Sequence, residues 1–305
     1  MRSLILTTMI GLVANLASAE VPPEQAALID KVVSRFKEND SRLGAVKARM
    51  KMVFERSPDF RPVQPPPPVV SPPRQPGGPV DSRSVLILHG PPKSIEWTAE
   101  VFGEIQRFNI AQWFGKEIIS ADAKGVTVYR PEENQAWIMP WTDRGIRANL
   151  QYDPRDFGFR TLDENLLRLH RLGKIESAKK FDRAGQKTIV ELRAKSLMEG
   201  NSVVIECSSR FGLLPTRVYY VLDDGRVNSV ADLTYQQVRV DSTPAWFLKS
   251  AVKRNAVVHN NKSPDDKEWG QVIRTTVTDV ELDKLPPPRD DELSLPQGTS
   301  IQRRL

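Results

Sequence analysis

The chain has 305 residues, of which 44 are lysine or arginine and 38 are aspartate or glutamate, so the net charge is +6 and the pI about 9.4. With 39% hydrophobic residues and a mean hydropathy of −0.41, the composition excludes a membrane bundle and a wholly disordered chain, and suits one sizeable domain or two modest ones. The basic excess is dispersed rather than gathered into a stripe, so we expect no nucleic-acid partner.

Residues 1–19 are predicted to be a signal peptide. Arg2 provides a positive start, residues 4–16 form an apolar run too short for a comfortable membrane span, and residues 17–19 match an A-x-A cleavage site. The mature protein is therefore expected to be periplasmic or secreted, without a transmembrane segment. Cys207 is the single cysteine, so no internal disulfide is expected.

Two amphipathic segments follow the cleavage site. Residues 22–38 begin with two prolines and then carry apolar side chains on one face and charges on the other, which predicts a helix. Residues 46–54 alternate between apolar and mostly charged positions, which predicts a long strand. The inward face of that strand is expected to carry Met50, Met52 and Phe54.

Residues 58–79 contain ten of the 24 prolines of the chain. Such a segment forms neither a strand nor a helix, and is expected to be disordered or to adopt a polyproline-II conformation. It is either a docking site for an envelope protein partner or a solvated loop inserted between two strands.

Six short β-prone runs separated by turn signals then predict an antiparallel sheet, because no helix intervenes between them. The runs are 84–89, 94–102, 104–114, 117–120, 125–130 and 135–139. A helix follows, predicted to begin with a capping box formed by Thr161 and Glu164, to present an apolar face of leucines, and to end at Gly173.

Residues 187–240 predict a four-stranded antiparallel meander. Its runs are 187–195, 201–209, 215–226 and 230–240, and Asp224-Gly225 is a strong hairpin signal. The period of two in the second run predicts one buried face carrying Val203, Ile205 and Cys207. Residues 242–255 and 271–282 continue the sheet, and residues 286–305 are expected to be an extended tail.

The search for chemistry leaves no catalytic candidate. The three histidines lack metal-ligand spacing, Cys207 has the setting of an inert core thiol, and no nucleophile elbow or phosphate loop is present. We expect no metal, no cofactor and no enzymatic activity. Large apolar residues on predicted strands could instead line a ligand pocket, or could simply fill the core of a large sheet. The candidate ligand-binding residues are Met50, Met52, Phe54, Trp113, Trp137 and Trp246.

Residues 212–226, GLLPTRVYYVLDDGR, resemble the "strand, x-G-x-x-P-x-R, strand, polar turn" passage of the periplasmic lipoprotein-carrier superfamily, the LolA/LolB-like fold. Residues 233–252 resemble that family's next strand pair, although Pro244 precedes Trp246 here instead of following it. The sequence places no counterpart of the family's lid-locking arginine, and the proline-rich insert is foreign to the compact carriers.

The resemblance implies an α+β fold, mainly antiparallel β, in which a curved, incomplete β-barrel is covered by a few helices. Residues 20–285 would form one such domain, with 58–79 as a disordered insert and 286–305 as the tail. An apolar cavity between sheet and helices would hold the acyl chain of a lipidated protein or a lipid. Separately from the resemblance, we expect a monomer.

Three functions follow from these observations. The first is a non-enzymatic periplasmic binder or carrier of lipoprotein acyl chains or other apolar ligands. The second is an envelope scaffold or interaction protein whose core is filled by its own side chains, with the proline-rich segment as its contact. The third is a hydrolase with a site scattered over loops.

Overall fold

The structure is a computed structural model that describes residues 21–56, 94–102, 105–112, 115–121, 125–140, 153–155, 157–159, 164–183, 186–197, 200–256, 261–282 and 295–303. The predicted signal peptide, the proline-rich segment and the predicted strand at 84–89 lie outside these residues. Within them, no helix is both long and apolar enough to span a membrane.

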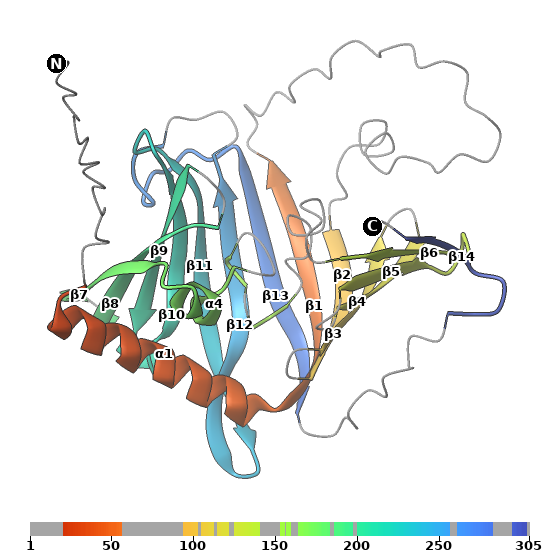
Figure 1. The fold of residues 1–305 in the computed structure, drawn as a ribbon, viewed down its shortest axis with the longest axis horizontal. Coiled ribbons are helices and arrows are strands. Elements are labelled where there is room, and N and C mark those ends of the chain that lie inside the picture. Colours follow the sequence, from red (N-terminus) through yellow and green to blue (C-terminus); the bar gives the residue numbers. More distant parts are fainter. Residues whose placement is uncertain are drawn as a thin grey trace, which may run out of the picture.

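The described residues form one large sheet accompanied by one long helix and two short helical segments (Figure 1). The helices are α1 (Pro23–Leu43), α4 (Leu166–Arg171) and the 3-10 helix η1 (Ser209–Phe211). The strands of the first half are β1 (Ala45–Arg56), β2 (Ser94–Phe102), β3 (Ile105–Gln112), β4 (Gly115–Ala121), β5 (Val126–Arg130) and β6 (Gln135–Met139). Those of the second half are β7 (Ile175–Arg183), β8 (Gln186–Lys195), β9 (Asn201–Ser208), β10 (Leu214–Leu222), β11 (Val227–Val240), β12 (Thr243–Asn255) and β13 (Gln271–Leu282), and β14 (Ser300–Arg303) follows.

The sheet consists of two sequential antiparallel meanders that meet side by side. β1 to β6 are neighbours in chain order, β7 to β13 likewise, and β1 pairs with β13 where the two runs meet. β14 pairs with β6 in parallel, whereas the other pairings between labelled strands are antiparallel. The sheet is curved but not closed into a barrel (Figure 1), so the predicted fold class is confirmed.

One face of the sheet packs against both helices in a single apolar cluster. α1 begins after Pro22, with Pro23 in its first turn, and runs across the β7–β13 half with α4 beside it (Figure 1). The side chains that α1 buries recur at helical spacing: Ile29, Val32, Val33, Phe36 and Leu43. At about 1.5–3 kcal/mol for each buried side chain, this face stabilises the docked helix by roughly 8–15 kcal/mol.

The predicted meander at 187–240 is confirmed as β8 to β11, with each strand antiparallel to the next. Val203, Ile205 and Cys207 point into the main cluster, as predicted. The prediction that the strand at 201–209, which is β9, has only one buried face is wrong. Val204, on the opposite face, is also buried, because residues 261–270 cover that side and place Trp269 in a second, smaller cluster with it.

The predicted capping box is also wrong. The helix begins one position after Asn165, and the side chain of Asn165 caps it by accepting a hydrogen bond from the backbone nitrogen of Arg168 at 2.9 Å. Thr161 lies outside the described residues. The helix ends two residues before Gly173, whose φ of +61° supplies the left-handed conformation expected of a stop.

Candidate functional site

Three of the six predicted ligand-binding residues lie on β1. Met50 and Met52 are 0% and 7% exposed inside the main cluster, and Phe54 is partly buried at its margin. Met50 pairs across the strands with Trp97 on one side and Val277 on the other. These methionines therefore sit among close-packed neighbours, and their role as ligand contacts stays a prediction.

The predicted tryptophans lie in different parts of the sheet. Trp246 is on β12, whereas Trp137 is on β6, in the other half. The indole nitrogen of Trp137 donates to Oε1 of Gln302 at 3.1 Å, and the guanidinium of Arg130 lies 4.9 Å from the centre of its ring. Trp113 lies outside the described residues. The structure thus does not bring Trp137 and Trp246 together.

Trp246 borders a small apolar cleft beneath the C-terminal part of α1, which we call the α1 cleft. Its volume is about 20 Å³, room for roughly one water molecule. Side chains from α1, β10, β11 and β12 line it, with a polar rim from α1 and from residues 153–155. The lining residues are Phe36, Asn39, Asp40, Leu43, Pro154, Arg155, Leu214, Tyr235, Trp246, Phe247 and Leu248.

An aromatic wall continues from the cleft toward η1. The ring of Phe211 lies 5.3 Å from that of Trp246 in an edge-on arrangement, and 5.5 Å from that of Tyr235. The Tyr235 hydroxyl donates to the carbonyl oxygen of Pro215 at 2.7 Å, which fixes the ring in place. The wall therefore presents a rigid apolar surface with its polar atom already satisfied.

Few polar contacts fasten α1 to the sheet. Near its C-terminal end, the Asn39 amide donates to the Trp246 carbonyl oxygen at 2.9 Å and accepts from the Trp246 backbone nitrogen at 2.8 Å, and Arg42 donates to the carbonyl oxygen of Pro244 at 3.3 Å. Near its start, Gln25 accepts from the backbone nitrogen of Ala178 at 3.1 Å. Asn39 is thus the main polar clamp beside the cleft.

An ionic cluster forms the rim of the α1 cleft. Arg155 donates to the Asp153 carboxylate from both its side chain and its backbone nitrogen, and its guanidinium lies 3.4 Å from the Asp40 carboxylate. Burial raises the pKa of Asp40 above its usual value, and Arg155 only partly opposes that effect. The ionised form of Asp40 is therefore disfavoured in the folded chain.

We expect the free energy of unfolding of Asp40→Asn at pH 7 to be higher than that of the wild-type chain by about 0.5 kcal/mol. A carboxyl with a raised folded-state pKa binds more protons folded than unfolded, so its contribution to stability is greatest at low pH and falls as pH rises through that pKa. Urea unfolding between pH 3 and 8 measures the difference in free energy of unfolding between the two chains, which should grow with pH.

Asp153→Asn is the control. It is expected to lower the free energy of unfolding by about 1–3 kcal/mol, because it weakens the acceptor of Arg155. A pH-independent loss in Asp40→Asn would contradict this account.

Glu164 fastens the start of α4 to the sheet. It is fully buried, and its carboxylate accepts hydrogen bonds from the Tyr220 hydroxyl at 2.6 Å, the Ser196 hydroxyl at 2.6 Å and the Leu197 backbone nitrogen at 2.8 Å. These donors come from β10 and from the β8–β9 turn. A buried carboxylate with three donors is stable only in this arrangement, so Glu164 ties the start of α4 to β10 and to the β8–β9 turn.

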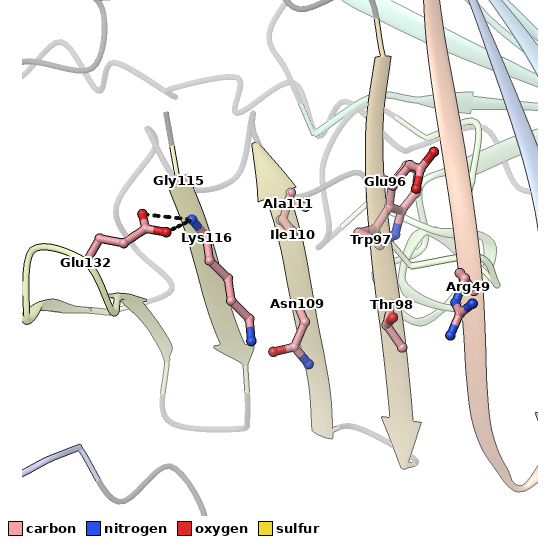
Figure 2. Close-up of a pocket in the computed structure, with 10 residues that line it drawn as sticks. All are labelled: Arg49, Glu96, Trp97, Thr98, Asn109, Ile110, Ala111, Gly115, Lys116 and Glu132. Carbon is pink, nitrogen blue, oxygen red and sulfur yellow. Dashed lines mark hydrogen bonds between the residues drawn. The ribbon is translucent and has the colours of Figure 1, made fainter. Parts of the chain in front are cut away.

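A wider groove of about 440 Å³ lies on the opposite, polar face of β1 to β4 (Figure 2). Arg49, Thr98 and Asn109 form a row across three paired strands. At one side the Glu132 carboxylate accepts from the backbone nitrogen of Lys116 at 3.0 and 3.2 Å. Cations and carboxylates are balanced along this groove, which marks it as the solvated side of the sheet rather than a site for an apolar ligand.

Cys207 matches the predicted inert thiol. It is fully buried in the main cluster, and burial raises its pKa well above the usual value. Within the described part of the chain, no three or more histidine, cysteine, aspartate or glutamate side chains are placed together to hold a metal ion.

Sequence reasoning missed most of the α1 cleft. Phe36 and Leu43 could have been found as the last apolar positions of the α1 stripe, and Phe247 as the residue next to Trp246 on β12; Tyr235 lies on the paired strand β11, opposite Leu248. Nothing in the sequence marks Asn39, and the sequence points to Glu164 only as a capping residue, because their actual partners lie 207 and 56 residues away.

The fold and the cleft define a class of protein: an open, curved antiparallel sheet whose apolar face is covered by helices. No protein-family model and no curated protein matches the sequence. Among solved structures, a putative outer membrane lipoprotein-sorting protein domain from Vibrio parahaemolyticus is similar, with a TM-score of 0.49 and 12% identity over 87% of this chain and 97% of that one.

Two further solved structures are similar to this chain. A LolA superfamily protein from Nitrosomonas europaea has a TM-score of 0.47 and 10% identity, covering 84% of this chain and 95% of that one. An uncharacterized conserved protein from Thermus thermophilus has a TM-score of 0.37 and 9% identity, covering 92% and 100%. The protein from Nitrosomonas europaea bears the name of the superfamily whose strand passage residues 212–226 resemble.

Proposed function

We propose that the protein is an exported, non-enzymatic binder or carrier of acyl chains or similar apolar ligands, which enter beneath α1 at the α1 cleft. The observation that carries the proposal is the contrast between the apolar contacts and the polar contacts that α1 makes with the sheet. Its apolar contact with the sheet is continuous and lined by aromatic side chains, whereas its polar fastening near the cleft rests mainly on Asn39.

The free energy gained by docking α1 on the sheet is comparable with the free energy gained by burying an acyl chain there. Docking α1 buries five large apolar side chains, about 8–15 kcal/mol. An acyl chain with about 15 methylene groups gains roughly 12 kcal/mol on full burial, at about 0.8 kcal/mol each. A ligand that takes the place of the helix can therefore offset the loss of its contacts, and the closed cleft is the expected state without ligand.

The movable element is α1 rather than α4. Gly44 joins α1 to β1 with φ +57° and ψ −125°, a conformation suited to glycine, so the helix can turn at this point. α4 is fixed by the buried Glu164 and touches α1, where Nε2 of His170 lies 3.4 Å from the Asp30 carboxylate. α4 therefore serves as the fixed neighbour past which α1 opens.

Weakening the clamp should tighten ligand binding. In Asn39→Ala, both hydrogen bonds to the Trp246 backbone are lost, which lowers the cost of opening by about 1–3 kcal/mol. Because apparent affinity scales with the fraction of binding-competent protein, dansyl-undecanoic acid should bind roughly tenfold more tightly to this variant than to the wild-type chain. Fluorescence titration of the mature protein measures both constants.

Two variants make the test specific. Arg35→Ala changes an exposed α1 residue that pairs with the exposed Glu38, and should leave the affinity unchanged. Trp246→Ala keeps the backbone atoms that bind Asn39 but removes part of the cleft wall, and should weaken binding several-fold. Equal affinities for the wild-type chain, Asn39→Ala and Trp246→Ala would count against binding at the cleft.

The close packing of β1 favours a second candidate, an envelope scaffold or interaction protein with a filled core. Met50 and Trp97 are 0% and 2% exposed. In this alternative the apolar face only stabilises the fold, and residues 58–79 would make the functional contact. The dansyl titration separates the two, because a scaffold binds no acyl chain in any of the variants.

A further inference from the structure

The last strand differs from the rest of the sheet. β14 has four residues, pairs in parallel with β6 from Ser300 beside Gln135 to Arg303 beside Ile138, and forms one of the two sheet edges. Its Ile301 side chain is 48% exposed. A short parallel edge strand with an exposed apolar side chain contributes little burial, so its position must depend on specific contacts.

Asn134 supplies most of those contacts. It lies in the turn between β5 and β6 with φ +46°, a conformation that asparagine tolerates better than most residues. Its carbonyl oxygen accepts from the Ser300 backbone nitrogen at 3.0 Å, and its side-chain amide donates to the Gly298 carbonyl at 3.2 Å. Its Oδ1 lies 2.8 Å from the Thr299 hydroxyl, whose single hydrogen is shared between this oxygen and the Pro296 carbonyl oxygen at 2.7 Å.

Trp137 adds a side-chain contact further along the same edge. Its indole nitrogen donates to Oε1 of Gln302 at 3.1 Å, while the guanidinium of Arg130 lies over its ring. The edge of β6 therefore recognises a pattern, a hydroxyl at one position and an amide three residues later, in addition to the backbone. That is the recognition expected of a site for strand addition.

The path from β13 to β14 is long. Seven strand spacings separate them, about 34 Å along the sheet at roughly 4.8 Å each. Residues 283–294 join Leu282 to Leu295, and twelve residues span at most about 40–43 Å at full extension. Because the link has little length to spare over this path, an equivalent tail from another molecule can compete for the edge of β6.

We propose that the edge of β6, with Asn134 and Trp137, is a strand-addition site for an extended segment with the tail's own pattern, and that a second copy of this chain supplies that segment by exchange of tails. The site lies in the opposite half of the sheet from the α1 cleft, so it does not rest on the function proposed above. The monomer predicted above is then the state at low concentration.

The test uses the full mature chain and a fluorescein-labelled peptide of residues 296–305, PQGTSIQRRL. Ser300→Pro removes the backbone N–H that bonds to Asn134 and frees the edge of β6 from its own tail. Fluorescence anisotropy should then show at least tenfold tighter peptide binding to Ser300→Pro than to the wild-type chain. Adding Asn134→Gly, which keeps the left-handed backbone, or Trp137→Phe should weaken that binding about tenfold.

A scrambled peptide and the thermal unfolding of each variant control for non-specific binding and for loss of fold. Light scattering after gel filtration, from about 5 to about 500 µM, should show a wild-type dimer that increases with concentration and is absent in Ser300→Pro. Equal peptide affinity in folded Ser300→Pro and wild-type chains, or equal binding of the scrambled peptide, overturns the site. A wild-type chain that stays monomeric throughout overturns the exchange of tails.

Discussion

Replacing Glu164 with alanine should lower the free energy of unfolding by about 3–5 kcal/mol. The carboxylate is fully buried and accepts hydrogen bonds from Tyr220, Ser196 and Leu197. Losing the acceptor of several buried donors costs about 1–3 kcal/mol for each group left without compensation. Because Glu164 lies just before α4, the variant should also loosen that helix, which hydrogen exchange of residues 166–171 measures alongside urea unfolding.

Tyr220→Phe is the matched variant for Glu164. It removes one of the three donors and leaves the other two, so its expected cost is about 1–2 kcal/mol. Glu164→Gln keeps a carbonyl acceptor, so its loss in free energy of unfolding should lie between those of Tyr220→Phe and Glu164→Ala. If the free energy of unfolding of Glu164→Ala is within about 1 kcal/mol of the wild-type value, the carboxylate does not hold α4 to the sheet.

The second large effect concerns Met50. Met50→Ala should lower the free energy of unfolding by about 2–5 kcal/mol, the usual range when a fully buried methionine is truncated and its neighbours cannot close the gap. Met50 lies between Trp97 and Val277 on the flanking strands, and both are buried. The collapse of neighbours into the space is therefore limited.

Arg49→Ala is the control for Met50, because it changes the adjacent residue of the same strand on the polar face, beside the wider groove. Its expected effect is within about 0.5 kcal/mol. Urea unfolding of both variants without ligand gives the comparison. A cost below about 1 kcal/mol for Met50→Ala would mean that the methionine lines an open pocket and that the core is not filled at β1.

The strands were predictable because their patterns are local. The period of two, the turn residues and the low helix content identified β2 as residues 94–102 and β13 as residues 271–282 with correct bounds. The same patterns predicted the meander of β8 to β11, and the stripe of α1 predicted its buried face. Such signals depend only on residues a few positions apart.

Features that depend on distant parts of the chain were not predictable. The local pattern of β9 could not reveal that residues 261–270 cover its outer face and bury Val204. The sequence of Glu164 fits a capping box, but tertiary bonds to Tyr220 and Ser196 use its carboxylate instead. The tail was expected only to be extended, and its pairing with β6 depends on a contact across 165 residues.

The candidate site also combines a residue that the local sequence pattern predicted correctly with one that it did not. Trp246 was singled out as a large apolar residue on a strand, and it does border the α1 cleft. Trp137 was chosen on the same grounds but lies against Gln302 at the far edge. Residue type alone could not separate them, because both sit on strands with similar patterns and only the order of strands in the sheet places them apart.

Native mass spectrometry of the protein, purified without detergent from the envelope of the cells that make it, measures whether the α1 cleft holds an apolar ligand. We expect a population carrying the added mass of an acyl chain or lipopeptide, which increases in Asn39→Ala and decreases in Trp246→Ala. The bare mass of the mature chain alone, in the wild-type protein and in both variants, would contradict it.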